Sequence, residues 1–149
     1  MHLHYTDYNI GSNNPLVKTC LELKVQHVKN TVGIGPHSCC AVMEFKLGNE
    51  THLYFGNSQL KNPIIDGIYT HDYMKCHGEA SAVMSVLDIL GDKSNIASSV
   101  KRVYIEMSPC ATRCAALLNN INNDLIVYYS FAHPNEVDAW KSAATKLCK

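Results

Sequence analysis

The seven residues SPCATRC, at positions 108–114, mark the boundary between a predicted strand and a predicted helix. The stretch before them, residues 100–107, is mostly apolar and predicts a strand. Ser108 and Pro109 form a typical helix start, and small or apolar residues then recur at helical spacing. A further strand is predicted over 124–129. Strands that alternate with helices in this way predict a mixed sheet with helices on its faces.

The rest of the chain continues this alternation. The chain begins with a predicted helix over 14–29, which GIGP at 33–36 ends, and continues with a predicted hairpin of strands over 39–47 and 51–55, joined through Gly48 and Asn49. A long loop over 56–76 and a helix over 78–90, which begins within CHGEA at 76–80, are predicted next. The strand, helix and strand described above follow, and His133 and Pro134 open a last predicted helix. The order α-β-β-α-β-α-β-α has no repeat and no linker. It predicts a single α/β domain over residues 1–149.

Composition limits the class of protein. Hydrophobic residues make up 46% of the chain and charged residues 17%, which suits a packed core. Thirteen acidic and thirteen basic residues leave no net charge, whereas proteins that bind long stretches of duplex nucleic acid are usually basic. A local basic patch would be enough for a nucleic-acid substrate. Seven cysteines at irregular spacing do not form a disulfide framework, and we expect reduced thiols. The sequence contains no membrane-span pattern and no signal-peptide pattern at its start.

Four side chains in CHGEA and SPCATRC form a candidate metal site. His77 and Glu79 stand at one predicted helix start, and Cys110 and Cys114 stand at the next. One imidazole and two thiolates fill three of the four positions that zinc prefers and leave one open for water, as in catalytic sites. Zinc lowers the pKa of such a water, and Glu79 can take its proton and deliver it to a substrate.

His77-Gly78-Glu79 and Pro109-Cys110 resemble the H-x-E and P-C-x-x-C signature of the cytidine deaminase superfamily. The resemblance covers nearly the whole chain. It implies a three-layer α/β/α sandwich with a mixed central sheet of four or five strands, and hydrolytic deamination of a nucleobase. One extra residue separates Cys110 from Cys114. Three residues of a helix turn about 300° and four turn about 400°, so both spacings return to nearly the same face.

The same resemblance implies substrate-binding residues. His37 and Ser38, ahead of the first hairpin strand, occupy the place of a substrate-lining loop. Asn57 resembles an asparagine that holds the sugar, although a turn residue after a strand is an equal alternative. Phe131 and His133 follow the last strand, where a ring could stack on a base; the alternative for Phe131 is a role in the core.

The stretch from Val127 to Trp140 resembles the C-terminal toxin domains of bacterial polymorphic secretion systems. That resemblance implies a bacterial effector, secreted or delivered, that deaminates cytosine to uracil in nucleic acid in the cytoplasm of a target cell. Single-stranded DNA is the favoured substrate, with duplex DNA and RNA as alternatives. It also implies an immunity protein as partner.

Two other functions stay open. A free cytidine or deoxycytidine deaminase would suit the neutral charge, because a nucleoside carries no phosphate. A structural zinc-binding interaction module would close its site with a fourth ligand such as Cys76 or His71.

Overall fold

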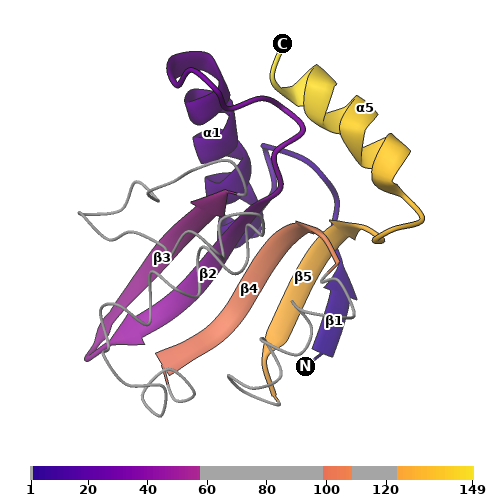
Figure 1. Ribbon diagram of the computed structural model, residues 1–149. Helices are drawn as coiled ribbons and strands as arrows, with labels where there is room; N and C mark the ends of the chain where they lie inside the picture. Colours follow the sequence, from indigo (N-terminus) through magenta and orange to yellow (C-terminus); the bar gives the residue numbers. More distant parts are fainter. Residues whose placement is uncertain (1, 58–98, 109–123) are drawn as a thin grey trace.

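The computed structural model describes residues 2–57, 99–108 and 124–149, and these form an α/β fold with a mixed sheet (Figure 1). The described elements are β1 (His2–Tyr5), α1 (Pro15–Asn30), β2 (Cys40–Leu47), β3 (Glu50–Asn57), β4 (Val100–Met107), β5 (Ile126–Phe131) and α5 (Val137–Leu147). The predicted helices over 78–90 and after Ser108, and the predicted loop over 56–76 except for Gly56 and Asn57, lie outside the described residues.

Among the described residues, the sheet has five strands in the order β1-β5-β4-β2-β3. β5 runs parallel to both β1 and β4, whereas β2 runs antiparallel to β4 and to β3. One edge of the sheet therefore collects the ends of β1, β3, β4 and β5 and the start of β2. We call this the carboxyl edge; it is marked by Tyr5, Cys40, Asn57, Met107 and Phe131.

The hairpin of β2 and β3 confirms the turn predicted from Gly48 and Asn49. Leu47 pairs with Glu50, so Gly48 and Asn49 alone form the connection between the two strands. Gly48 has a φ of 62°, a left-handed conformation that glycine adopts without the steric cost of a Cβ.

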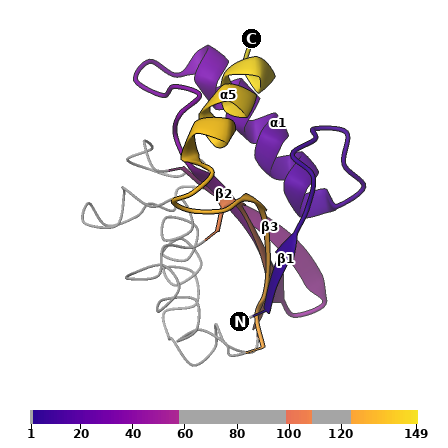
Figure 2. The same ribbon diagram turned by 90° about the vertical axis from the view of Figure 1, so that its right-hand side faces the viewer.

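Helix α1 also confirms its prediction. The Asn14 side chain accepts a hydrogen bond from Leu16 N at 3.0 Å, and Pro15 stands in the first turn, where its missing N–H costs nothing. Its inner face buries Leu16, Val17, Cys20, Leu21, Lys24 and His27. Glu106 of β4 contacts both Lys24 of α1 and Trp140 of α5. The two helices therefore cover the same face of the sheet, as Figures 1 and 2 show.

Two details at the chain ends differ from the sequence prediction. The strand β1 was not predicted; it joins β5 through the bonds His2 N to Leu125 O and Thr6 N to Tyr129 O, each 2.8 Å. Helix α5 begins at Val137 and not at His133. Glu136 ties both its backbone N–H and its side chain to Ala132, at 2.8 Å each, so residues 132–136 form a turn before the helix starts. Trp140 and Ala144 of α5 are buried.

None of the helices in the described part of the chain combines the length and the apolar character needed to cross a membrane.

Candidate functional site

The four predicted metal and catalytic residues, His77, Glu79, Cys110 and Cys114, lie outside the described residues. Within residues 2–57, 99–108 and 124–149, no group of three or more His, Cys, Asp or Glu side chains could hold a metal ion. The zinc site therefore stays a prediction from the sequence.

Two of the predicted substrate-binding residues meet at the carboxyl edge. Asn57, the last residue of β3, donates from Nδ2 to Ser38 Oγ at 2.9 Å and to Cys40 Sγ at 3.0 Å. Ser38 Oγ donates in turn to Gly35 O at 2.8 Å. Ser38 and Asn57 are fully buried, so Asn57 does more than end a strand: its side chain holds the chain just before β2.

His37 points the other way from its neighbour Ser38 and is exposed. Its Nε2 lies 2.9 Å from Thr145 Oγ1 on α5. Thr145 donates its own hydroxyl hydrogen to Lys141 O at 2.9 Å, so His37 Nε2–H is the donor in this contact. In the predicted substrate-lining loop, Ser38 therefore faces the sheet and His37 faces α5.

Phe131 and His133 lie where β5 leaves the carboxyl edge. Phe131 is partly buried, and its ring meets Tyr8 edge-on with centroids 5.2 Å apart, which favours packing over a free stacking surface. His133 is exposed. Ser108 joins both residues: its N–H donates to Phe131 O at 2.8 Å, and its Oγ accepts from His133 N at 2.9 Å.

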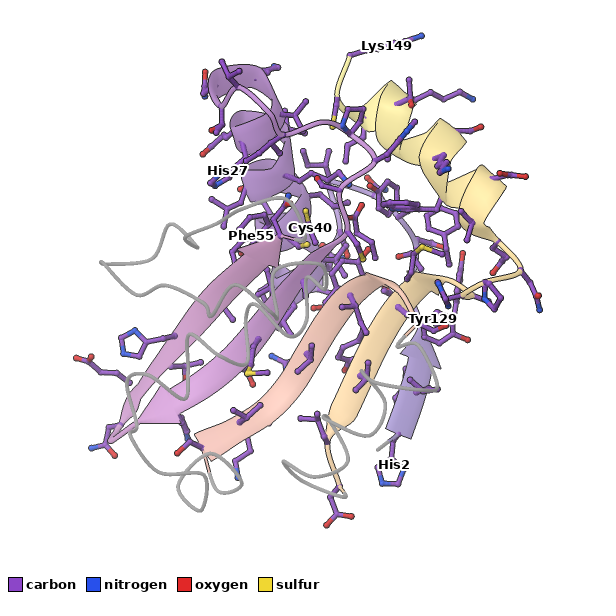
Figure 3. The ribbon with its side chains drawn as sticks, in the orientation of Figure 1. His2, His27, Cys40, Phe55, Tyr129 and Lys149 are labelled. Carbon is purple, nitrogen blue, oxygen red and sulfur yellow. The ribbon has the colours of Figure 1, made fainter. Side chains whose placement is uncertain are left out.

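Behind this edge lies a buried ion pair that the sequence analysis did not identify. Lys24 Nζ is 2.8 Å from both carboxylate oxygens of Glu106, and both side chains are fully buried. Lys24 also donates to Ser38 O at 2.6 Å, and Glu106 Oε1 accepts from Cys40 N at 2.7 Å. Figure 3 labels Cys40, whose backbone N–H is one of these donors.

Tyr8 and Trp140 complete the hydrogen bonding of the carboxylate. Both donate to Glu106 Oε2, Tyr8 from its hydroxyl and Trp140 from Nε1 at 3.1 Å. Burial and the charge of Glu106 raise the pKa of Tyr8 far above its usual range, so this hydroxyl stays a donor. Burial alone would lower the pKa of Lys24, but the attraction of Glu106 outweighs it and raises that pKa. The ammonium is therefore charged inside the core.

The four cysteines of the described residues, Cys20, Cys39, Cys40 and Cys148, are free thiols. Cys20 and Cys40 are fully buried, and burial raises the pKa of both thiols, so they are protonated near neutral pH. Cys39 and Cys148 are only partly buried.

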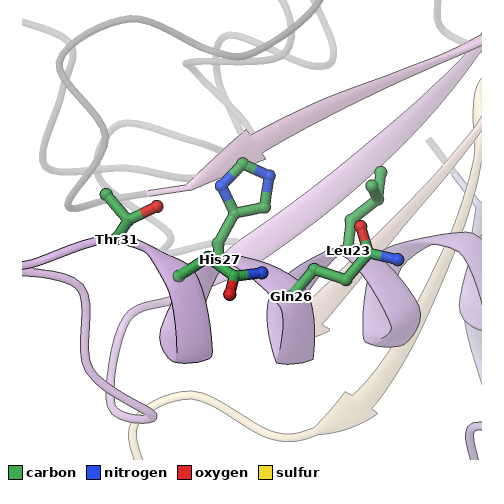
Figure 4. Close-up of a pocket in the computed structure, with 5 residues that line it drawn as sticks. Leu23, Gln26, His27 and Thr31 are labelled. Atoms are coloured by element: carbon green, nitrogen blue, oxygen red, sulfur yellow. The ribbon is translucent and has the colours of Figure 1, made fainter.

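A pocket of ≈ 240 Å³ lies beside the second half of α1, lined by Leu23, Gln26, His27, Asn30 and Thr31 (Figure 4). The His27 ring stacks on Phe55 of β3, with centroids 5.1 Å apart and planes 20° apart. Its Nδ1 is buried and has no hydrogen-bond partner among the described residues. Burial lowers the pKa of His27, which keeps the stacked ring neutral.

Comparison of the chain with protein-family models, with curated proteins and with solved structures finds no match.

Proposed function

We propose that this protein is a zinc-dependent deaminase that converts cytosine to uracil in nucleic acid, with single-stranded DNA as the favoured substrate. The observation that carries the proposal is the meeting of separate predicted site residues at one edge of the sheet. Ser38 and Asn57 touch there, and Ser108, two residues before Cys110, is bonded to Phe131 and His133 at the same edge.

Chain connectivity supports placing the metal ligands near this edge. Cys110 follows Met107, the last residue of β4, by three positions in the sequence. Met107 pairs with Phe131 at the carboxyl edge. The parallel pairing of β4 and β5 also requires a crossover connection between them. That requirement supports a predicted helix after Ser108 and, with α1 and α5 on one face, a three-layer α/β/α sandwich.

The donor set suits zinc. In the proposed site, His77, Cys110 and Cys114 would hold the metal, which would supply a water of lowered pKa. Glu79 would accept the first proton of that water and deliver it to the ring nitrogen. It would then pass the proton of the newly added hydroxyl group to the amine, which leaves as ammonia. Ser38 and Asn57, which are buried and bonded to each other, would brace the segment before β2 beneath the target nucleotide. His133 offers an exposed ring beside the neighbouring nucleotide.

The biological setting that we propose rests on the resemblance of the C-terminal stretch to bacterial toxin domains. In this setting the domain is secreted or delivered, deaminates nucleic acid in the cytoplasm of a target cell, and is blocked by an immunity protein in the producing cell.

The test compares single-stranded DNA, duplex DNA, RNA and free cytidine as substrates, with conversion of cytosine to uracil as the readout. We expect conversion in single-stranded DNA and a loss of at least about 100-fold in Glu79→Gln, because general acid–base catalysis contributes that much or more. Bound zinc, measured by elemental analysis, should be unchanged in this variant. Glu50→Gln, an exposed glutamate at the hairpin, is the matched control and should keep full activity.

Other results would contradict the proposal in recognisable ways. Conversion of cytidine but of no polymer would identify a nucleoside deaminase. Tight zinc with no conversion of any substrate would favour a structural zinc module. Full activity in Glu79→Gln would remove Glu79 from the mechanism.

A further inference from the structure

A basic pocket lies between α5 and the loop that precedes β2. It has a volume of ≈ 310 Å³ and is lined by His37, Lys141, Ser142, Thr145, Lys146 and Lys149. Lys149, labelled in Figure 3, marks the end of the chain beyond α5. We call this site the α5 pocket. It brings three ammonium groups, two hydroxyl groups and one imidazole to a single concave surface.

The charge of the α5 pocket is not compensated within the described part of the chain. Lys141, Lys146 and Lys149 are exposed, and none of the ion pairs among the described residues includes them. The acidic residues of this segment, Glu136 and Asp138, stand at the opposite, N-terminal end of α5. A protein without net charge thus carries a local cluster of positive charge.

The segment of His37 and Ser38 links the α5 pocket to the candidate functional site. His37 binds Thr145 inside the pocket, and its neighbour Ser38 binds Asn57 at the carboxyl edge. A residue that lines the basic surface therefore directly precedes, in the chain, a buried residue of the carboxyl edge. A ligand that fills both would present a nucleoside to the edge and a phosphate to α5.

We infer that the α5 pocket binds the phosphate backbone of a polynucleotide substrate, beside the nucleotide that reacts. The inference rests on the proposed function for its link to catalysis. Lysine ammonium groups and hydroxyl donors are the usual partners of phosphate oxygens, and such contacts fix the position of the strand without reading its sequence. The pocket supplies the local basic patch that a polymer substrate needs and a free nucleoside does not.

An anionic membrane surface fits this pocket less well. Stable interfacial binding combines basic residues with apolar side chains that enter the bilayer. The large apolar side chains exposed among the described residues are Leu3, Tyr5, Ile10 and Val32, and none of them belongs to α5.

The experiment uses the full chain and measures binding separately from chemistry. The triple variant Lys141→Gln/Lys146→Gln/Lys149→Gln keeps long side chains but removes three charges. The control Lys18→Gln/Lys46→Gln/Lys101→Gln removes the same charge from exposed sites outside the pocket. The probe is a fluorescein-labelled single-stranded DNA of about ten nucleotides, a length within the usual range that one single-strand-binding site covers.

We expect the triple variant to bind this DNA about ten-fold more weakly, because each exposed charge pair contributes a modest amount. The slope of log affinity against log salt should fall by about two, since each phosphate neutralised on a single strand contributes about 0.7. The control should change neither. Conversion of free cytidine, if the wild type shows any, should be unaltered in the triple variant.

The inference and the proposed function can fail separately. Equal DNA binding and equal salt slope in the triple variant and the control would overturn the inference, even if the wild type deaminates DNA. Loss of binding to phosphatidylserine vesicles with DNA binding unchanged would overturn it too and would identify a membrane surface. If the wild type deaminates no substrate but the triple variant loses DNA binding, the inference about the α5 pocket stands and the proposed enzymatic function is wrong.

Discussion

At the scale of single residues, Lys24 and Glu106 illustrate what a buried ion pair does in this fold. Removing two charges from water costs more than their attraction returns unless further hydrogen bonds satisfy them. Here the backbone of the segment that carries Ser38 provides two of those bonds, through Ser38 O and Cys40 N. The pair therefore fixes the position of a segment that we place beside the substrate, and its individual members are hard to remove.

A double-mutant cycle tests this interpretation. Lys24→Met leaves Glu106 charged and unpaired in the core, and Glu106→Gln does the same to Lys24, so each single change should lower the free energy of unfolding by about 3–5 kcal/mol. The double variant removes both charges, and Gln can still accept from Cys40 N. We expect it to be more stable than the sum of the single changes predicts, by at least about 1 kcal/mol in urea unfolding.

The salt bridge between Arg102 and Glu44 provides the matched control for this cycle. It joins two strands, β4 and β2, but its side chains keep exposures of 30% and 16%. Water screens such a pair, so Arg102→Met and Glu44→Gln should couple by less than about 1 kcal/mol. If the coupling energy between Lys24 and Glu106 is no larger than the coupling energy of this control pair, the two buried charges are not held as a pair.

The sequence contains part of the signal for this pair. Glu106 is the one acidic residue in the strand VKRVYIEM, and a carboxylate at a buried strand position needs a partner. The partner could not be identified, because Lys24 lies 82 residues away and occupies a mostly apolar helix face. Local patterns identify which residue is unusual, whereas the fold decides what it meets.

At the scale of elements, the predictions held where a local rule acts alone. Asn14 and Pro15 fix the start of α1, and Gly48 fixes the hairpin turn. The strand β1 could not be predicted, because it has only four residues and all of them are exposed. Its pairing with β5 creates it. The start of α5 was placed too early because the bonds from Glu136 to Ala132 hold residues 132–136 in a turn.

The contact of α1 with β3 through His27 predicts how stability depends on pH. Burial lowers the pKa of His27 from its ordinary value of 6.5, so the unfolded chain binds a proton more readily than the folded one. This contribution is fully present above about pH 6.5 and is lost as the pH falls below it. His27→Phe keeps a flat ring against Phe55 and removes the titration. Its urea midpoint should therefore fall less than that of the wild type between about pH 7 and pH 5.

His133→Phe is the control for this measurement, because it removes an exposed histidine. We expect its urea midpoint to follow the wild type across the same pH range. An unchanged pH dependence in His27→Phe would show that the buried ring does not titrate differently in the folded chain.

At the scale of the whole molecule, the topology explains why residues far apart in the sequence gather at one edge. Strand β5 runs parallel to β4 and β1, and the hairpin adds the end of β3 and the start of β2 at the same side. The sequence predicted the residue types at the candidate site, but not that Ser38 would meet Asn57 or that His37 would turn to α5. Those contacts depend on the strand order, which no local pattern specifies.

The proposed zinc site makes a last prediction about the stability of the whole chain. A metal that binds the folded chain and not the unfolded one stabilises the fold. If free zinc exceeds its dissociation constant about 100-fold, a chelator should lower the melting temperature by about 5 to 10 °C. Cys114→Ser should lose most of the bound zinc and melt close to the chelated wild type.

Cys148→Ser is the matched control, since Cys148 caps the C-terminal end of α5 and makes no disulfide. It should keep the zinc content and the chelator response of the wild type. Zinc content separates the two readings of the extra residue between Cys110 and Cys114. Full zinc in Cys114→Ser would assign the third ligand to another side chain, whereas its loss would show that a spacing of four residues along a helix serves one metal ion.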